Sequence, residues 1–211
     1  MAPFTPDVVM KSGDFHVVDP NGAKRSLTPS YFKDLAILEA SVEGQGTWRI
    51  SSGIREGRTS KVIRKGDDWV FLEPGKPVPA GTEPADMQSV TTAETYVSRG
   101  GPSDAVLAPV GRGLEFRAVT HPNRISVGQD ARFEVLIDGK PLPQQKIQLV
   151  RADEDIEGGK VQEVVADANG AFVLKVARPG LYLAITRHRI APAAGQPGKS
   201  LTYALTFEAV E

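Results

Sequence analysis

The sequence predicts an all-β fold made of two β-sandwich domains. Apolar residues recur at every second position in several short segments, which is the spacing of half-buried strands. Reversals rich in glycine, proline, asparagine and aspartate separate these segments, and helical periodicity is absent. A run of short antiparallel strands buries its apolar residues by packing two sheets face to face. The 211 residues suit two domains of about 100 residues each.

Two hairpins are expected at the N-terminal end. Phe15 and Val17 precede the reversal at residues 19–22, which leads into residues 24–28. Residues 34–42 and 46–54 form a second expected hairpin around residues 43–45. Its expected core side chains are aromatic, leucine or β-branched, types that suit a half-buried pleated surface: Leu35, Ile37, Trp48 and Ile50.

The stretch between these hairpins and the second domain is less regular. Residues 60–63 and 69–72 are weaker strand predictions, and residues 89–99 are a stronger one. The proline- and glycine-rich residues 73–81 predict a connector, because proline cannot sit in a central strand. A single helical turn is predicted over residues 29–34, with Thr28 as its N-cap.

Two further hairpins are expected in the C-terminal half. Residues 133–137 alternate in polarity, Asp138-Gly139 reverses the chain, and the alternation resumes at Ile147 and Leu149. Residues 161–165 and 171–176 flank a second reversal at residues 167–170, in which Gly170 supplies a positive φ. Pro179-Gly180 then leads into a strand over residues 181–185.

The density of glycine and proline over residues 100–113 predicts a domain boundary near Val110. We expect an N-terminal domain over residues 1–109 and a C-terminal domain over residues 110–211. The chain starts abruptly at a segment resembling a strand end, residues 7–10, so the first domain is expected to lack an upstream strand. An unpaired edge there favours dimerisation by strand addition.

Composition excludes several classes of protein. The net charge is −1 and the two signs are mixed along the chain, which argues against a nucleic-acid partner. Cysteine is absent, so disulfides and thiolate chemistry are excluded. No run of apolar residues is long enough to span a membrane, and no secretory signal peptide is present in this sequence. Common phosphate-binding, hydrolase and zinc-protease motifs are absent, so we expect a protein that is not an enzyme.

Several motifs together resemble one bacterial family. They are ETYVSRG at 94–100, GRGLEFRAVTHPN at 111–123, VLIDGKPL at 135–142, DANGAF at 167–172 with PGLYL at 179–183, and the terminal YALTFEAV. In this order the motifs look like an exported domain-of-unknown-function family associated with the periplasmic component of cobalt or nickel uptake.

The resemblance implies a periplasmic or otherwise exported protein with a transthyretin-like, immunoglobulin-like C-terminal domain and no catalytic residues. Its implied role is non-enzymatic binding or accessory work in transition-metal ion uptake, with nickel or cobalt, or iron or copper, as the ion. A membrane transporter or an outer-membrane receptor is the implied partner. Family members carry an upstream signal peptide and then a histidine beside an aromatic residue, a segment without counterpart here.

Three histidines are the candidate metal ligands, and none lies at a local ligand spacing from another. His121 is the strongest, because it follows a strand predicted over residues 114–119 and borders a loop; capping the domain junction by hydrogen bonds is the alternative. His188 lies between two arginines whose charge repels a cation, so a solvated strand end is expected. His16 is expected on the surface.

Acidic and aromatic clusters have simpler expected roles. Residues 153–157 do not match the spacing of a calcium loop, and a solvated hairpin loop is expected. Asp67 and Asp68 could pair as acid and base, but no second carboxylate motif supports a glycosidase. Four aromatic residues could form a stacking platform for a glycan or peptide, with core packing as the alternative: Trp69, Tyr96, Tyr182 and Tyr203.

Metal-ion uptake is the leading expected function. The alternative is a structural or adhesive module that binds a protein or glycan through its loops or a strand edge.

Overall fold

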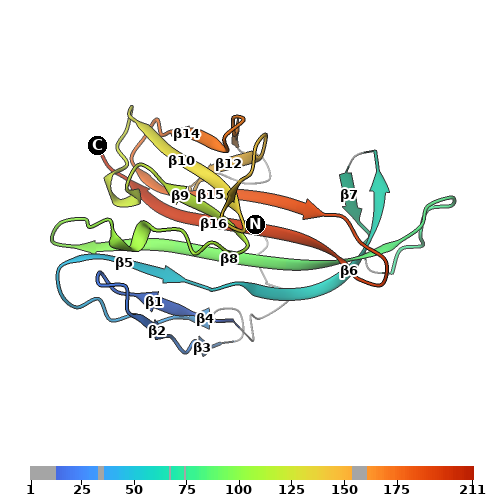
Figure 1. Cartoon of the computed structure of the whole chain (residues 1–211), viewed down its shortest axis with the longest axis horizontal. Coiled ribbons are helices and arrows are strands. Elements are labelled where there is room, and N and C mark those ends of the chain that lie inside the picture. Colours follow the sequence, from blue (N-terminus) through green and yellow to red (C-terminus); the bar gives the residue numbers. More distant parts are fainter. Residues whose placement is uncertain (1–12, 33–35, 67, 74, 154–160) are drawn as a thin grey trace.

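The computed structural model describes residues 13–32, 36–66, 68–73, 75–153 and 161–211. Strands dominate these residues, and the helical segments among them are two short 3-10 turns, η1 (Ala105–Leu107) and η2 (Pro122–Arg124). The prediction of an all-β sandwich is therefore confirmed (Figure 1). In the part of the chain that is described, no helix is long and apolar enough to cross a membrane.

One large sheet contains strands from both ends of the sequence. Its path runs β13-β12-β15-β16-β8-β5-β1-β2, and β6 and β7 branch from β8. The bounds of these strands, in chain order, are β1 His16–Val18, β2 Lys24–Ser26, β5 Gly46–Ser51, β6 Arg55–Lys65, β7 Asp68–Phe71, β8 Ala85–Arg99, β12 Lys146–Arg151, β13 Gln162–Val165, β15 Gly180–Ile190 and β16 Gly198–Ala209.

A second sheet covers part of this large sheet. It consists of β9 (Leu114–Ala118), β10 (Asp130–Ile137), β11 (Lys140–Pro141) and β14 (Ala171–Lys175), with β10 in the centre. The core lies between the two layers and is rich in aromatic rings. The ring centroid of Phe116 in β9 lies 4.9 Å from that of Phe172 in β14 and 4.8 Å from that of Tyr203 in the large sheet. Both ring pairs meet edge to face. Such contacts add about 0.5–1.5 kcal/mol each beyond the area they bury.

The large sheet is joined across its middle by a parallel pair. β8 and β16 run side by side in register from Met87 opposite Gly198 to Thr95 opposite Thr206. β8 precedes Val110 and β16 follows it, so the sheet is continuous across the predicted domain boundary (Figure 1). The boundary itself stays a prediction.

The C-terminal reversals form as predicted, but neither closes the hairpin that was predicted around it. Asp138-Gly139 turns β10 into β11, whereas β12, which contains Ile147 and Leu149, pairs with β13 and β15 in the large sheet. The predicted hairpin of residues 133–137 with Ile147 and Leu149 is therefore wrong. The reason is that both segments are apolar on their inner faces and pack against each other from opposite layers.

The reversal at residues 167–170 connects the two layers, because β13 belongs to the large sheet and β14 to the second sheet. Gly170 has the expected positive φ of 75°, and its amide donates to the carbonyl oxygen of Asp167 at 3.1 Å. However, β13 pairs with β12 and β14 pairs with β10, so the predicted hairpin of these two strands is also wrong. The strand that follows Pro179 is confirmed as β15.

At the N-terminal end one hairpin is confirmed and one is not. β1 and β2 pair around residues 19–22 as expected. β5 pairs with β1 and β8 rather than with residues 34–42, so the second predicted hairpin is wrong. Trp48 is buried and Ile50 half-buried, whereas Ile37 is 50% exposed because its strand belongs to a separate pair. Asp34 and Leu35 lie outside the described residues.

That separate pair consists of β3 (Ser30–Tyr31) and β4 (Ala36–Ile37). It occupies the segment for which a helical turn was predicted, so that prediction is wrong where the chain is described. Proline fixes only its own φ, and that value is compatible with the start of a strand as well as with a first helical turn.

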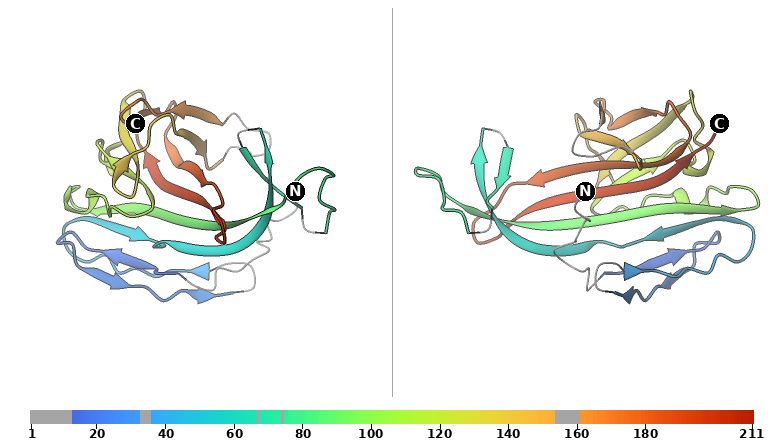
Figure 2. Two further views of the ribbon diagram at one scale, coloured as in Figure 1. Left: turned by 45° about the vertical axis from the view of Figure 1, so that its right-hand side comes forward. Right: turned by 180° about the vertical axis from the view of Figure 1, so that it is seen from behind.

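The segment between β5 and β8 forms an extended arm. β6 contains the weaker strand predicted over residues 60–63, and β7 covers 69–71 of the one predicted over 69–72. The described residues of the connector that follows are irregular as expected. Figure 2 shows this arm projecting together with the far ends of β8, β15 and β16. Asp68 of β7 forms an ion pair with Arg189 of β15, which ties the arm to the large sheet.

Candidate functional site

A cleft of about 480 Å³ opens where the second sheet stops covering the large one. Its floor is the inner face of β5, β8 and β16, one wall is the β1–β2 hairpin, and the other is the segment before and at the start of β9. Directly opposed residues share a face of a sheet. Register therefore places Arg49, Ser51 and Glu94 on the same face as Tyr203, which packs into the core. The cleft is thus the open edge of the sandwich interior.

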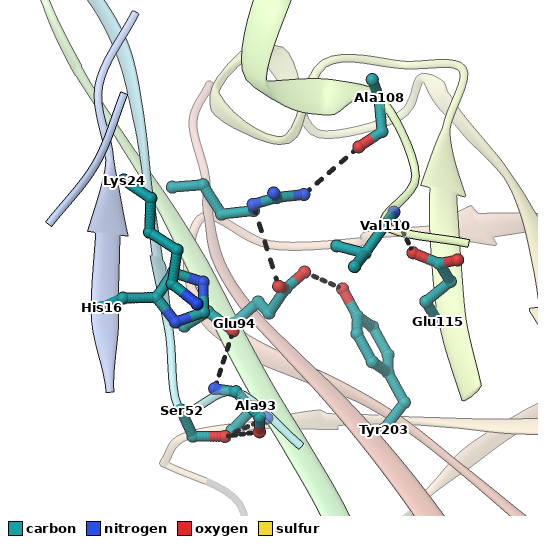
Figure 3. A network of polar contacts seen from close by, with 12 residues as sticks. His16, Lys24, Ser52, Ala93, Glu94, Ala108, Val110, Glu115 and Tyr203 are labelled. Atoms are coloured by element: carbon teal, nitrogen blue, oxygen red, sulfur yellow. Dashed lines mark hydrogen bonds and ion pairs between the residues drawn. The ribbon is translucent and has the colours of Figure 1, made fainter. Parts of the chain in front are cut away.

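A buried carboxylate forms the centre of the floor. The hydroxyl of Tyr203 donates to Oε2 of Glu94 at 2.8 Å, and Nε of Arg49 lies 3.9 Å from Oε1 (Figure 3). Nη1 of Arg49 donates to the carbonyl oxygen of Ala108 at 3.2 Å. The side chain of Glu94 is 7% exposed and that of Arg49 12% exposed. Burial, followed by the charge of Glu94, holds the pKa of Tyr203 well above its usual range, so the phenol stays a donor.

A second carboxylate lies on the wall formed by the start of β9, opposite the β1–β2 hairpin. Glu115 of β9 accepts hydrogen bonds from the amides of Val110 at 2.7 Å and Gly111 at 2.8 Å (Figure 3). Burial raises the pKa of Glu115, and the charge of Glu94 acts in the same direction, while the two amides oppose the rise. The cleft therefore holds two buried carboxylates, and the charge of Glu94 acts on Glu115.

The mouth of the cleft is charged and exposed. Nζ of Lys24 lies 2.6 Å from Oδ2 of Asp14, and this bond is the main cause of the lowered pKa of Asp14. The positive charge of Arg112 lowers the same pKa from across the mouth. Nδ1 of His16 lies 2.5 Å from the carbonyl oxygen of Asp14. Since a carbonyl only accepts, Nδ1 carries the proton of that ring.

His121 lies outside this cleft, in a buried polar network. It is 5% exposed, and its Nδ1 accepts from the amide of Asn123 at 3.0 Å. Nε2 must then carry the proton of the neutral ring, and it lies 3.2 Å from the carbonyl oxygen of Ser103 and 3.0 Å from Oγ1 of Thr47. Both ring nitrogens are therefore engaged in hydrogen bonds that join β5, the loop after β8 and η2. Metal binding by His121 stays a prediction.

The other two histidines are less exposed than expected. His16 is 8% exposed and lines the cleft, so its expected surface position is wrong. The reason is that alternation presumes one solvated face, whereas all three residues of β1 are buried. His188 is half-buried, and its Nδ1 lies 3.3 Å from Oε1 of Gln145. Within the described ranges, no group of three or more histidines and carboxylates is placed to hold a metal ion.

The remaining predicted clusters have structural roles where they are described. Asp68 pairs with Arg189, and Asp153 pairs with Arg151. Asp67 and residues 154–157 lie outside the described residues. Tyr96, Tyr182 and Tyr203 are 7% exposed or less, so the stacking platform is wrong for these three, and core packing is their role. Trp69 is half-buried.

Sequence reasoning missed the residues that form the cleft. Arg49, Glu94 and Glu115 come from three strands far apart in the chain, so no local spacing links them. One signal was available: Glu94 interrupts the face of its predicted strand that carries Val90 and Tyr96, whereas Glu115 falls on the polar side of its strand's alternation and gave no signal. A charged residue in such a position is rare unless it is paired or functional.

The fold and this site define an all-β sandwich with a polar, charged cleft at the open edge of its interior. The chain belongs to a family described as a domain of unknown function (DUF4198), whose model matches residues 1–190. No curated protein matches the chain.

Proposed function

We propose that this protein is a non-enzymatic binding protein that holds a small polar ligand in the cleft. The observation that carries the proposal is the pair of buried carboxylates, Glu94 and Glu115, which face a cavity rather than a packed core. Burying a carboxylate is costly unless it gains partners. A volume of about 480 Å³ also lies within the range of about 300–1,000 Å³ typical of small-molecule sites.

Binding rather than catalysis is proposed because each buried charge in the cleft is held by fixed partners. Glu94 is fixed by Tyr203 and Arg49, and Glu115 by two backbone amides. Such an arrangement resists movement and orients acceptors toward a ligand. We propose that the protein does this work in the periplasm or elsewhere outside the cytoplasm, beside a membrane transporter or an outer-membrane receptor. The motif resemblance supports this location, this partner and a transthyretin-like C-terminal domain.

Transition-metal binding is a second candidate function. It is favoured by the presence of an imidazole and three carboxylates along the same cleft: His16, Asp14, Glu94 and Glu115. These groups are ligand types for first-row metals. The cations Lys24, Arg49 and Arg112 line the same cavity and would repel the ion. A nickel or cobalt site there, or at His121, requires the groups to rearrange.

A protein-binding role through a strand edge is the third proposal. β2 is the last strand of the large sheet within the described residues, and its three residues are exposed. An exposed edge can pair with another chain, including a second copy. Light scattering at high protein concentration tests for such a dimer, and a monomer throughout the range contradicts it.

The main experiment is calorimetric titration of the whole chain with two sets of ligands. One set is nickel, cobalt, copper and iron salts, and the other is a library of small polar metabolites of either charge. We expect a metabolite to bind saturably, and we expect the change Glu115→Gln to weaken it roughly tenfold by removing a charged acceptor.

The matched control is Glu163→Gln, an exposed residue of β13 paired with Lys146 and outside the cleft. Metal binding that is lost in His16→Ala or His121→Ala would support the second candidate function. Absence of binding by every compound and ion would contradict both.

A further inference from the structure

The charges of the cleft are separated by depth. The mouth carries Lys24 and Arg112 against Asp14, which is an excess of positive charge. The interior carries Glu94 and Glu115 against Arg49, which is an excess of negative charge when both carboxyls are ionised. The exposure of the side chains separates the two zones: Lys24 and Asp14 are 48% and 56% exposed, and Arg49 and Glu94 are 12% and 7% exposed.

The interior carboxylates retain acceptor capacity. A carboxylate offers about four lone-pair sites. Among the described residues, Glu94 accepts one hydrogen bond from a side chain, that from Tyr203, and Oε1 has Arg49 only at an ion-pair distance of 3.9 Å. Glu115 accepts two. Both carboxylates line the cleft, so a donor that enters can reach them.

The mouth retains donor capacity. Arg112 is exposed and forms no hydrogen bond or ion pair with the residues that are described, although its charge acts on Asp14. A guanidinium with five N–H groups binds a carboxylate through two parallel hydrogen bonds. Lys24 faces the same opening from the other wall (Figure 3).

From these observations we infer that the ligand is a zwitterion, a free amino acid or dipeptide, bound with its ammonium group inward and its carboxylate at the mouth. An ammonium group brings three donors and a positive charge to the Glu94 and Glu115 side. The ligand carboxylate meets Arg112 and Lys24. The charges of these six side chains, three positive and three negative, sum to zero when all are ionised. A ligand without net charge is therefore the best electrostatic match. This inference rests on the proposed function of the cleft.

The test uses calorimetric titration of the whole chain at pH 7.5. The probes are the common amino acids and a set of dipeptides, followed by the amide and the N-acetyl derivative of the tightest binder. The amide keeps the ammonium group and loses the carboxylate, and the N-acetyl compound does the reverse. We expect each derivative to bind at least about tenfold more weakly than the parent, because each loses one charge-assisted contact.

Two variants locate the ends of the ligand. Arg112→Gln is expected to weaken the parent several-fold and to leave its amide unchanged. Glu94→Gln, which still offers an acceptor to Tyr203, is expected to weaken the parent and the amide and to leave the N-acetyl compound unchanged. The matched controls are Arg117→Gln, on β9 and outside the cleft lining, and Glu163→Gln.

The outcomes separate the inference from the proposed function. Cleft binding of anions alone or cations alone would overturn the zwitterion and leave the binding role intact. If no amino acid or dipeptide binds, the zwitterion is overturned. The small-ligand role is overturned as well only if the metabolite library of the main experiment also fails to bind, and binding of a metal salt alone would then favour the second candidate.

Discussion

His121 and Tyr203 show how single buried polar groups fix this fold. Each lies where elements distant in sequence meet, and each is hydrogen-bonded to a side chain of a strand far away in the sequence. A buried polar group costs about 1–3 kcal/mol when its partner is removed. The free energy of unfolding is therefore sensitive to the protonation of one ring or to the loss of one hydroxyl group.

The first prediction concerns pH and His121. Burial lowers the pKa of His121 in the folded protein from its ordinary value of 6.5, so between the two pKa values the unfolded chain binds more protons than the folded one. Stability contributed by this group is complete above pH 6.5, and it declines as the pH falls toward the folded pKa. Chemical denaturation at several pH values measures this decline, and we expect a smaller decline in His121→Gln.

His188 provides the control for that experiment. Burial lowers the pKa of His188 as well, so this ring also makes the protein less stable as the pH falls. His188→Gln should remove only the part of that decline which His188 causes. Glu115 acts in the opposite direction, because its raised pKa favours the folded state at low pH and that contribution is lost as the pH rises above 4.5. An unchanged pH profile in His121→Gln would show that this ring does not set the profile.

The second prediction concerns the change Tyr203→Phe. It removes the donor that satisfies Oε2 of Glu94 while leaving the ring in the core. We expect a loss of about 1–3 kcal/mol in the free energy of unfolding, measured by urea denaturation. Tyr182→Phe is the comparison, because that hydroxyl donates to a backbone carbonyl near the surface and not to a buried charge. A larger loss in Tyr182→Phe would contradict the importance of the Glu94 contact.

At the scale of elements, a tight turn can join the two layers instead of closing a hairpin. The turn before β14 depends on Gly170, whose φ is +75°. A Cβ placed there would lie 2.8 Å from the carbonyl oxygen of Val135 and 3.1 Å from the amide of Leu142. Both are backbone atoms, one of β10 and one of the residue after β11, and they are hydrogen-bonded to each other, so neither can move aside cheaply.

The third prediction follows from that contact. Gly170→Ala should lower the free energy of unfolding by about 2 kcal/mol or more, since it adds a steric clash to the cost of about 1 kcal/mol for a positive φ. The matched control is Gly195→Ala, where φ is +73° and no atom lies within 4 Å of the new Cβ. Thermal unfolding of the two variants measures the difference, and equal losses would show that the close approach is not limiting.

The sequence predicts strands and turns well here, but not the pairing of strands. Two-residue alternation and turn residues locate β1, β2, β8, β10 and β15, because both are local properties. Pairing depends on which layer each apolar face joins, and alternation is the same for either layer. For that reason β12 and β13 were assigned to the wrong partners, and Ile37 was expected in a core that it does not reach.

The candidate site was unpredictable for a related reason. Glu94 and Tyr203 are more than a hundred residues apart, and they meet only because β8 and β16 pair in parallel. Parallel pairing of strands so distant leaves no periodic trace in either segment. Among the three histidines the sequence favours His121 as a ligand, but the structure places it in a buried hydrogen-bond network apart from the cleft.

At the scale of the whole molecule, the continuity of the large sheet has a consequence for folding. The parallel pair of β8 and β16 buries Leu201, Tyr203 and Leu205 against the second sheet, and it carries strands from both sides of Val110. Neither half of the chain has these contacts alone. Elements that share one core unfold together when the domain is two-state.

The fourth prediction is therefore a single cooperative unfolding transition of the whole chain. We expect fluorescence of the two tryptophans, both N-terminal to Val110, to change at the same urea concentration as the far-UV circular dichroism of all strands. The change Leu205→Ala, on β16, should move both signals together by about 2–5 kcal/mol, because it opens a cavity in the shared core. Two separated transitions, or a tryptophan signal that Leu205→Ala leaves in place, would instead support independent domains with a boundary near Val110.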